Sequence, residues 1–302
     1  MLRKNQIVKF ILTFTFILCL YGNSGYLYAE VIQKGHSPVP DAVAIPRPTA
    51  NEVKIAEDGV KKYLENAAPE IKKINKKYPG LISVTVPREN TATVPNLMPF
   101  FQQKHQANLE VARKGDIDVL FMGDSITDFW RNEGGPYGGK PVLDKYFGHL
   151  KVANFGIAGD TTQGVLYRLE NGEGKGFSPK VVMLMIGTNN TMQNTAPEIA
   201  EGIGAVVLEL QKDFPMAKIL LLAVFPRNTP TDPVRKTIDE INTSISKLDD
   251  GKKIFYLDTG SKFLDEKGFI PKDVMSDSLH PTTKGYEIWA NAVKDHIENL
   301  MK

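Results

Sequence analysis

The sequence has a single cysteine among its 302 residues, and this scarcity excludes most thiol chemistry. Cys19 lies in an apolar stretch near the N-terminus, so cleavage of a leader would leave a mature chain without cysteine. Disulfide bonds, thiolate catalysis and cysteine-based metal sites are then excluded together. The preceding residue is Leu18, whereas a lipid-modified cysteine normally follows a small residue, so we expect no lipid anchor.

Net charge is also small once the first residues are set aside. The chain has 37 basic and 35 acidic residues, which gives a formal charge of +2. Residues 1–29 contain Arg3, Lys4 and Lys9 and no acidic residue, so the remaining residues carry about one net negative charge. A nearly neutral body gives no electrostatic reason to expect a nucleic-acid partner.

The N-terminus has the parts of a secretory signal peptide. A basic segment precedes the apolar residues 10–21, which are too few to span a bilayer comfortably, and small and polar residues follow up to Ala29. We predict a signal peptide over residues 1–29 with cleavage near Ala29, and therefore a secreted or periplasmic protein without a stable membrane anchor. Leu27 departs from the small residue expected three positions before the cut, so the cleavage site stays open, and an uncleaved anchor is the alternative.

Residues 30–97 lack the regular pattern of the rest of the chain. Four prolines in residues 30–50 predict a linker or an extended arm. Residues 51–80 predict a short amphipathic helix interrupted at Pro69, whose lysines form a solvated face or, alternatively, contact the cell envelope. We treat residues 30–97 as a Pro-rich arm with a short helical extension, for which partial disorder is an open option.

From Met98 onward, apolar runs alternate with segments of helical spacing. The predicted strands cover residues 119–122, 151–154, 181–186, 219–224 and 254–257, and the predicted helices cover residues 98–115, 161–169, 197–212, 233–248 and 282–301. Several strand runs are apolar without alternation, as expected when helices cover both faces of a parallel sheet. Residues 98–302 therefore predict one α/β domain of three layers, α/β/α, around a parallel sheet of about five strands.

Polar or glycine-rich loops follow the first three strands and precede the final helix. Their sequences are "GDSITD", "FGIAGDTT", "GTNN" and "MSDSLHP". In open parallel sheets, functional residues gather beyond the carboxyl ends of the strands. We therefore expect these four loops to meet at one edge of the sheet.

Ser125 in the first loop is either a turn residue or a nucleophile. A serine nucleophile needs a base within hydrogen-bond reach, and that base must be oriented by a third group. Of the five histidines, only His280 lies in one of the loops, and Asp277 precedes it by three residues. The others lie in the arm, on predicted helices or before the second strand (His36, His105, His149 and His296).

Acyl transfer also requires hydrogen-bond donors for the developing oxyanion, each worth roughly 100- to 1000-fold in rate. The backbone N–H of Ser125 is one candidate. Gly159 offers an unobstructed backbone N–H, and Asn189 offers a side-chain amide. The alternatives are a turn at Gly159 and a loop or capping role for Asn189.

The four motifs "GDSIT", "NFGIAGD", "GTNN" and "DSLHP", in this order, resemble the blocks of the SGNH (GDSL-type) hydrolases. The resemblance covers roughly residues 98–302. The stretches "NFGIAGDTTQGVLYRLENGE" and "VVMLMIGTNN" are most similar to the platelet-activating-factor acetylhydrolase-like, or acetylesterase, branch.

This resemblance implies a flavodoxin-like fold and assigns a role to each candidate residue. Ser125 becomes the nucleophile, Asp277 and His280 complete a triad, and Ser125, Gly159 and Asn189 form the oxyanion hole. The chain departs from the family pattern at Ile126, where the motif has leucine, and at Asn190, where many members have aspartate.

Other signatures are absent from the sequence. Thr127 stands where the G-x-S-x-G motif of α/β-hydrolases requires glycine, and "GIAGD" lacks the G-x-G-x-x-G dinucleotide fingerprint. No group of His, Asp and Glu has metal-ligand spacing, so we expect neither a metal nor another cofactor.

Several neighbouring residues are candidates for substrate contact. Ile126 and Leu279 flank the nucleophile and the base and would shorten the acyl pocket, while Arg227 contacts substrate or ties down a loop. Trp130, Tyr137 and Trp289 are candidates for a sugar-stacking wall, with core packing as the alternative for Trp289. Asp124 is expected to cap the helix that follows Ser125.

The sequence therefore predicts a secreted serine esterase that removes short acyl groups, above all acetyl, from a carbohydrate or cell-wall glycan through an acyl-enzyme. The first alternative is a lysophospholipase, lipase or thioesterase of the same superfamily. The second, of a different class, is a non-catalytic carbohydrate-binding protein.

Overall fold

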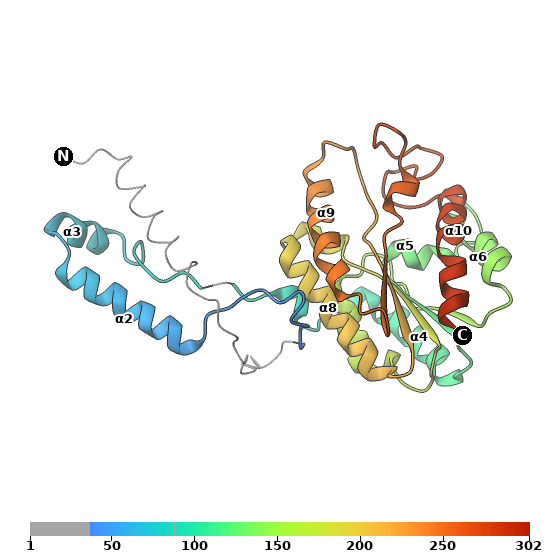
Figure 1. The fold of residues 1–302 in the computed structure, drawn as a ribbon, viewed down its shortest axis with the longest axis horizontal. Coiled ribbons are helices and arrows are strands. Elements are labelled where there is room, and N and C mark those ends of the chain that lie inside the picture. Colours follow the sequence, from blue (N-terminus) through green and yellow to red (C-terminus); the bar gives the residue numbers. More distant parts are fainter. Residues whose placement is uncertain (1–36, 87) are drawn as a thin grey trace. The chain divides into compact units, whose positions relative to one another are not determined.

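The computed structural model describes residues 37–86 and 88–302 (Figure 1). The predicted signal peptide over residues 1–29 and its expected cleavage near Ala29 lie outside the described residues. Of the helices in the described part of the chain, none combines the length and apolarity needed to cross a membrane.

A five-stranded parallel sheet forms the centre of the domain. Its strands are β1 (Val119–Gly123), β2 (Val152–Asn154), β3 (Val181–Met185), β4 (Lys218–Leu222) and β5 (Ile254–Leu257), in the order β2-β1-β3-β4-β5. Every residue of β1 and β3 is buried, since successive side chains point to opposite faces and both faces are covered. The predicted parallel sheet is confirmed.

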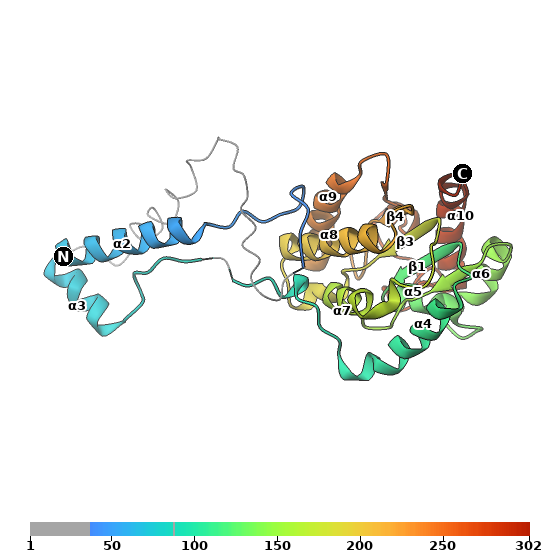
Figure 2. The same ribbon diagram turned by 90° about the horizontal axis from the view of Figure 1, so that it is seen from below.

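Helices cover both faces of this sheet and form two separate apolar cores. The first core includes residues of α4 (Gln102–Lys114), α7 (Thr162–Arg168), α8 (Ala196–Asp213) and α9 (Pro233–Ile245), and the second includes residues of α5 (Ser125–Asp128), α6 (Lys140–Phe147) and α10 (Thr283–Leu300). Figure 2 shows β1, β3 and β4 between α8 and α10. The three-layer α/β/α fold is thus confirmed, although the sequence did not predict α6.

Two segments outside the sheet are tied to α8 by ion pairs. Both guanidinium Nη atoms of Arg47 donate to the fully buried carboxylate of Glu201, each at 2.7 Å. Arg88 binds Glu198 through Nε and Nη2, at 2.8 and 2.6 Å. Ala92 is fully buried beside α8 as well, so the packed domain begins before the boundary that we expected at residue 98.

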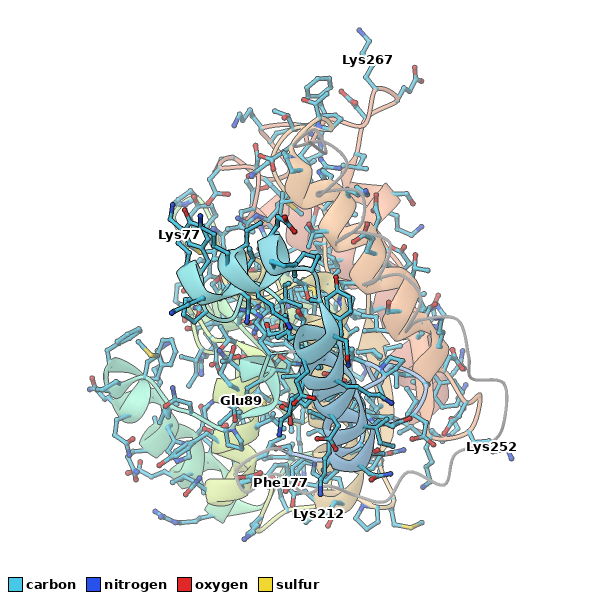
Figure 3. All side chains as sticks on the ribbon, turned by 90° about the vertical axis from the view of Figure 1, so that its left-hand side faces the viewer. Lys77, Glu89, Phe177, Lys212, Lys252 and Lys267 are labelled. Carbon is cyan, nitrogen blue, oxygen red and sulfur yellow. The ribbon has the colours of Figure 1, made fainter. Side chains whose placement is uncertain are left out.

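Between Arg47 and Arg88 the chain forms a helical hairpin, α2 (Ala50–Asn66) and α3 (Pro69–Lys77). The break falls at the predicted Pro69, which occupies the first turn of α3. Thr49 and Glu52 form a capping box at the start of α2, and Lys77, labelled in Figure 3, ends α3. Neither helix has a buried residue.

Candidate active site

The chain leaves β1 through Asp124 and Ser125. The Oδ1 atom of Asp124 accepts the N–H of Ile126 at 3.0 Å, which confirms the expected helix cap. Burial raises the pKa of Asp124 to about 7, although the hydrogen bond from Ile126 opposes this shift. Ser125, the first residue of α5, is buried, with 6% of its surface exposed.

The loop before α10 brings His280 and Asp277 to this serine. The Oγ atom of Ser125 lies 2.9 Å from Nε2 of His280, and Nδ1 of His280 lies 2.6 Å from Oδ2 of Asp277. Oδ1 of Asp277 accepts the backbone N–H groups of Leu279 and His280, at 3.0 and 2.8 Å. The structure therefore brings together the three residues that the sequence singled out.

The surroundings of Asp277 keep its carboxyl group ionised. Burial acts to raise its pKa, but the backbone N–H of His280, the His280 ring and the N–H of Leu279 outweigh burial and lower the pKa to about 2. An anion facing Nδ1 favours the tautomer with the proton on that atom, which we therefore assign. Nε2 then carries a lone pair directed at the hydroxyl of Ser125.

Gly159 and Asn189 come from the loops after β2 and β3. Gly159 has φ +86°, a conformation that favours glycine. The side-chain amide of Asn189 donates to the carbonyl of Asp160 at 2.7 Å, so it is held beside the Gly159 loop. Among the described residues, the backbone N–H groups of Ser125 and Gly159 find no protein acceptor, which leaves both available to a ligand.

A buried ion network, which sequence reasoning missed, supports this loop. Arg168 is fully buried and donates to Oδ2 of Asp160 through Nε and Nη2, at 3.0 and 2.8 Å, and to Glu173. Glu173 also contacts Nδ1 of His105 at 2.7 Å, and this histidine is buried on α4. The sequence did contain one indication of this network, because Arg168 follows the apolar residues of α7 at a position that predicts burial.

Of the three predicted pocket residues, two pack against the second core and the third, Arg227, binds a neighbouring loop. Ile126 is 1% exposed within the second core, so its side chain does not line an open pocket, and Leu279 is half-buried against the same core. Nη1 of Arg227 donates to the carbonyl and hydroxyl oxygens of Thr188, both at 3.3 Å. Arg227 thus ties the loop after β4 to the loop after β3, the second of its two expected roles.

The expected sugar-stacking wall does not exist as a unit. Trp130 and Trp289 are fully buried, with ring centroids 5.1 Å apart, and belong to the second core. Burial of a large aromatic ring stabilises the fold strongly, so both tryptophans pack into the core although Trp130 follows Ser125 closely in the chain. Tyr137 alone remains beside the site, where its hydroxyl contacts Asp277.

Comparisons with known proteins agree with this geometry. A family model described as the GDSL-like Lipase/Acylhydrolase family matches residues 121–288. Human platelet-activating factor acetylhydrolase IB subunit alpha2 is 38% identical over 223 residues, which cover 70% of this chain and 93% of that protein. The rat alpha1 subunit is 34% identical over 198 residues, which cover 65% of this chain and 82% of the other.

The solved structure of a GDSL-like lipase from Bacteroides thetaiotaomicron has the same fold. It is similar to this chain with a TM-score of 0.53 at 21% identity, covering 66% of this chain and 97% of that one.

Proposed function

Because this chain belongs to the GDSL-like lipase/acylhydrolase family of SGNH hydrolases, and is therefore an ester-hydrolysing enzyme, we propose that it is a secreted esterase that removes short acyl groups, above all acetyl, from carbohydrates. The observation that carries the proposal is the hydrogen-bonded chain from Ser125 through His280 to Asp277. This is the arrangement that activates a serine for attack on a carbonyl carbon.

In the proposed reaction, Oγ of Ser125 attacks the ester carbonyl while Nε2 of His280 takes its proton. Asp277 keeps the imidazole oriented and stabilises the imidazolium that forms. The backbone N–H groups of Ser125 and Gly159 and the amide of Asn189 donate to the oxyanion, each contributing roughly 100- to 1000-fold in rate.

His280 then returns the proton to the leaving alcohol, and the acyl group remains on Ser125. In the second half of the reaction, His280 removes a proton from water, and the resulting attack releases the acid and restores the hydroxyl of Ser125.

The confined site supports a short acyl group. Ser125 is 6% exposed, and Phe101, itself 5% exposed, lies 3.5 Å from where a side chain on Gly159 would begin. The human relative is named an acetylhydrolase, which favours acetyl. The predicted signal peptide supports a substrate outside the cytoplasm, where acetylated glycans are accessible acyl esters.

The decisive experiment compares hydrolysis of p-nitrophenyl acetate and p-nitrophenyl octanoate by the purified chain and by Ser125→Ala. We expect acetate to be the faster substrate by at least about 10-fold, and the variant to lose about 10⁴-fold or more in kcat while melting at the same temperature. Release of acetate from a partly acetylated oligosaccharide tests the acceptor class. A preference for octanoate would indicate a lipase or thioesterase, and equal rates with Ser125→Ala would remove Ser125 as the nucleophile.

A further inference from the structure

Tyr137 makes a direct hydrogen bond to the carboxylate that orients His280. Its hydroxyl donates to Oδ2 of Asp277 at 3.0 Å, and the same oxygen faces Nδ1 of His280 at 2.6 Å. Since two backbone N–H groups already bind Oδ1, all four donors together fix both oxygens of the carboxylate. Tyr137 is the one side chain outside the loop of Asp277 among these four donors.

Aromatic rings also restrict the imidazole of His280. The ring centroid of Tyr137 lies 5.3 Å from that of His280, and the ring of Phe129 lies 5.1 Å from it. Phe129 and Tyr137 stack on each other with centroids 5.7 Å apart and an interplanar angle of 18°. The imidazole therefore contacts a stacked aromatic pair, which limits its rotation away from Ser125.

The segment that carries Tyr137 is held in place at both of its ends. At its base, the N–H of Lys140 donates to the carbonyl of Asn132 at 2.9 Å. The hydroxyl of Thr283, three residues after His280, donates to the carbonyl of Gly138 at 2.9 Å. A Cβ atom at Gly139 would lie 2.6 Å from the carbonyl oxygen of Phe129, so only glycine allows this close approach.

We propose that Tyr137 is a positioning residue that holds the Asp277–His280 pair in line with Ser125. The proposal rests on the proposed function, because it assumes that this pair serves the serine during catalysis. Tyr137 binds the ionised carboxylate that faces the imidazole, and the imidazole gains its positive charge only as the transition state forms. Its hydroxyl therefore affects turnover rather than substrate affinity.

Two substitutions separate the hydroxyl from the ring. We expect Tyr137→Phe, which keeps the stacked ring, to lower kcat on p-nitrophenyl acetate by about 10- to 100-fold, with KM changed by less than about twofold. Tyr137→Ala removes the ring as well and should cost more. Tyr146→Phe is the matched control, because its hydroxyl accepts a hydrogen bond from Asn291 on α10 without touching the site, and kcat should stay unchanged.

A double-substitution cycle tests whether the effect passes through the carboxylate. In the Asp277→Asn background, Tyr137→Phe should lower kcat by less than about twofold further, because the charged acceptor is already gone. The proposal is overturned if Tyr137→Phe keeps the wild-type kcat, if only KM rises, or if the loss is equally large in both backgrounds. Wild-type activity in Ser125→Ala would instead overturn the proposed function, and the inference with it.

Discussion

Two helices of nearly equal length, α2 and α8, begin with the same local signal and differ in their surroundings. Both have a capping box, formed by Thr49 and Glu52 in α2 and by Thr195 and Glu198 in α8. None of the 17 residues of α2 is buried, whereas 13 of the 18 residues of α8 are. Capping therefore determines where each helix begins, while only α8 draws stability from tertiary packing.

The two regions also differ in chemistry. A hollow of about 510 Å³ lies on the hairpin between α2 and residues 82–84, and its lining includes Glu57, Lys61 and Ser83 but no histidine. The groups able to do acyl chemistry instead meet at Ser125, where His280 and Asp277 form a hydrogen-bonded chain with its hydroxyl. The size of a hollow is thus a poorer guide to function here than the hydrogen bonds between titratable side chains.

The largest expected effect comes from truncating one leucine in each helix. Leu210→Ala on α8 should reduce the free energy of unfolding by about 2–5 kcal/mol, because a fully buried side chain leaves a cavity. Leu64→Ala on α2 should cost less than about 1 kcal/mol, since that side chain is half-exposed. Urea unfolding of both variants checks this, and equal losses would show that the hairpin unfolds together with the domain.

A smaller effect is the pH dependence of stability, which should differ between the buried Asp124 and the exposed Asp58 on α2. Burial raises the folded pKa of Asp124 from 3.8 to about 7, so its contribution to stability is full below about pH 4 and is lost as the pH rises through about 7. Asparagine does not titrate, so the free energy of unfolding of Asp124→Asn lacks this pH-dependent loss. The difference in unfolding free energy between the variant and wild type should therefore shift by about 2 kcal/mol in favour of the variant between pH 5 and pH 8.

The matched control for this substitution is Asp58→Asn on α2, an exposed position. Urea unfolding of the three proteins at pH 5 and pH 8 gives the comparison. A pH-independent difference between Asp124→Asn and wild type would mean that Asp124 stays ionised in the folded protein throughout this range.

The smallest expected effect is that of removing the hairpin itself. Replacing residues 50–86 with a short Gly-Ser linker, while keeping Arg47 and Arg88, should leave kcat/KM on p-nitrophenyl acetate within about twofold and stability within about 0.5 kcal/mol. Ester hydrolysis and thermal melting measure both. A large loss of activity would instead assign the hairpin a part in the site.

The sequence predicted most of the sheet because its strands are unbroken apolar runs. All five strands lie within two residues of the predicted bounds, and the Asp277–His280 spacing pointed to the loop that the structure places against Ser125. The side chain of Ile126 was wrongly expected in the pocket, because neighbouring residues on a helix point in directions about 100° apart and Ile126 faces the core.

Contacts between distant residues left no local pattern to read. The hydroxyl of Tyr137 reaches Asp277 from 140 positions away, and Glu198 and Glu201 bind arginines more than 100 positions earlier in the chain. In the sequence, the glycine-rich segment around Tyr137 reads as a turn, and Glu198 and Glu201 read as ordinary polar residues of a helix. Only the folded arrangement shows that they are partners.

The two arginine anchors have a consequence for the evolution of this chain. Glu198 and Glu201 lie one helical turn apart, so the chain leaves and returns to α8 at nearly the same point. Whatever lies between Arg47 and Arg88 is then a closed loop whose ends are already paired. Doubling such a loop costs only about 0.6 kcal/mol in closure entropy, so long insertions at this position reduce the stability of the domain only slightly.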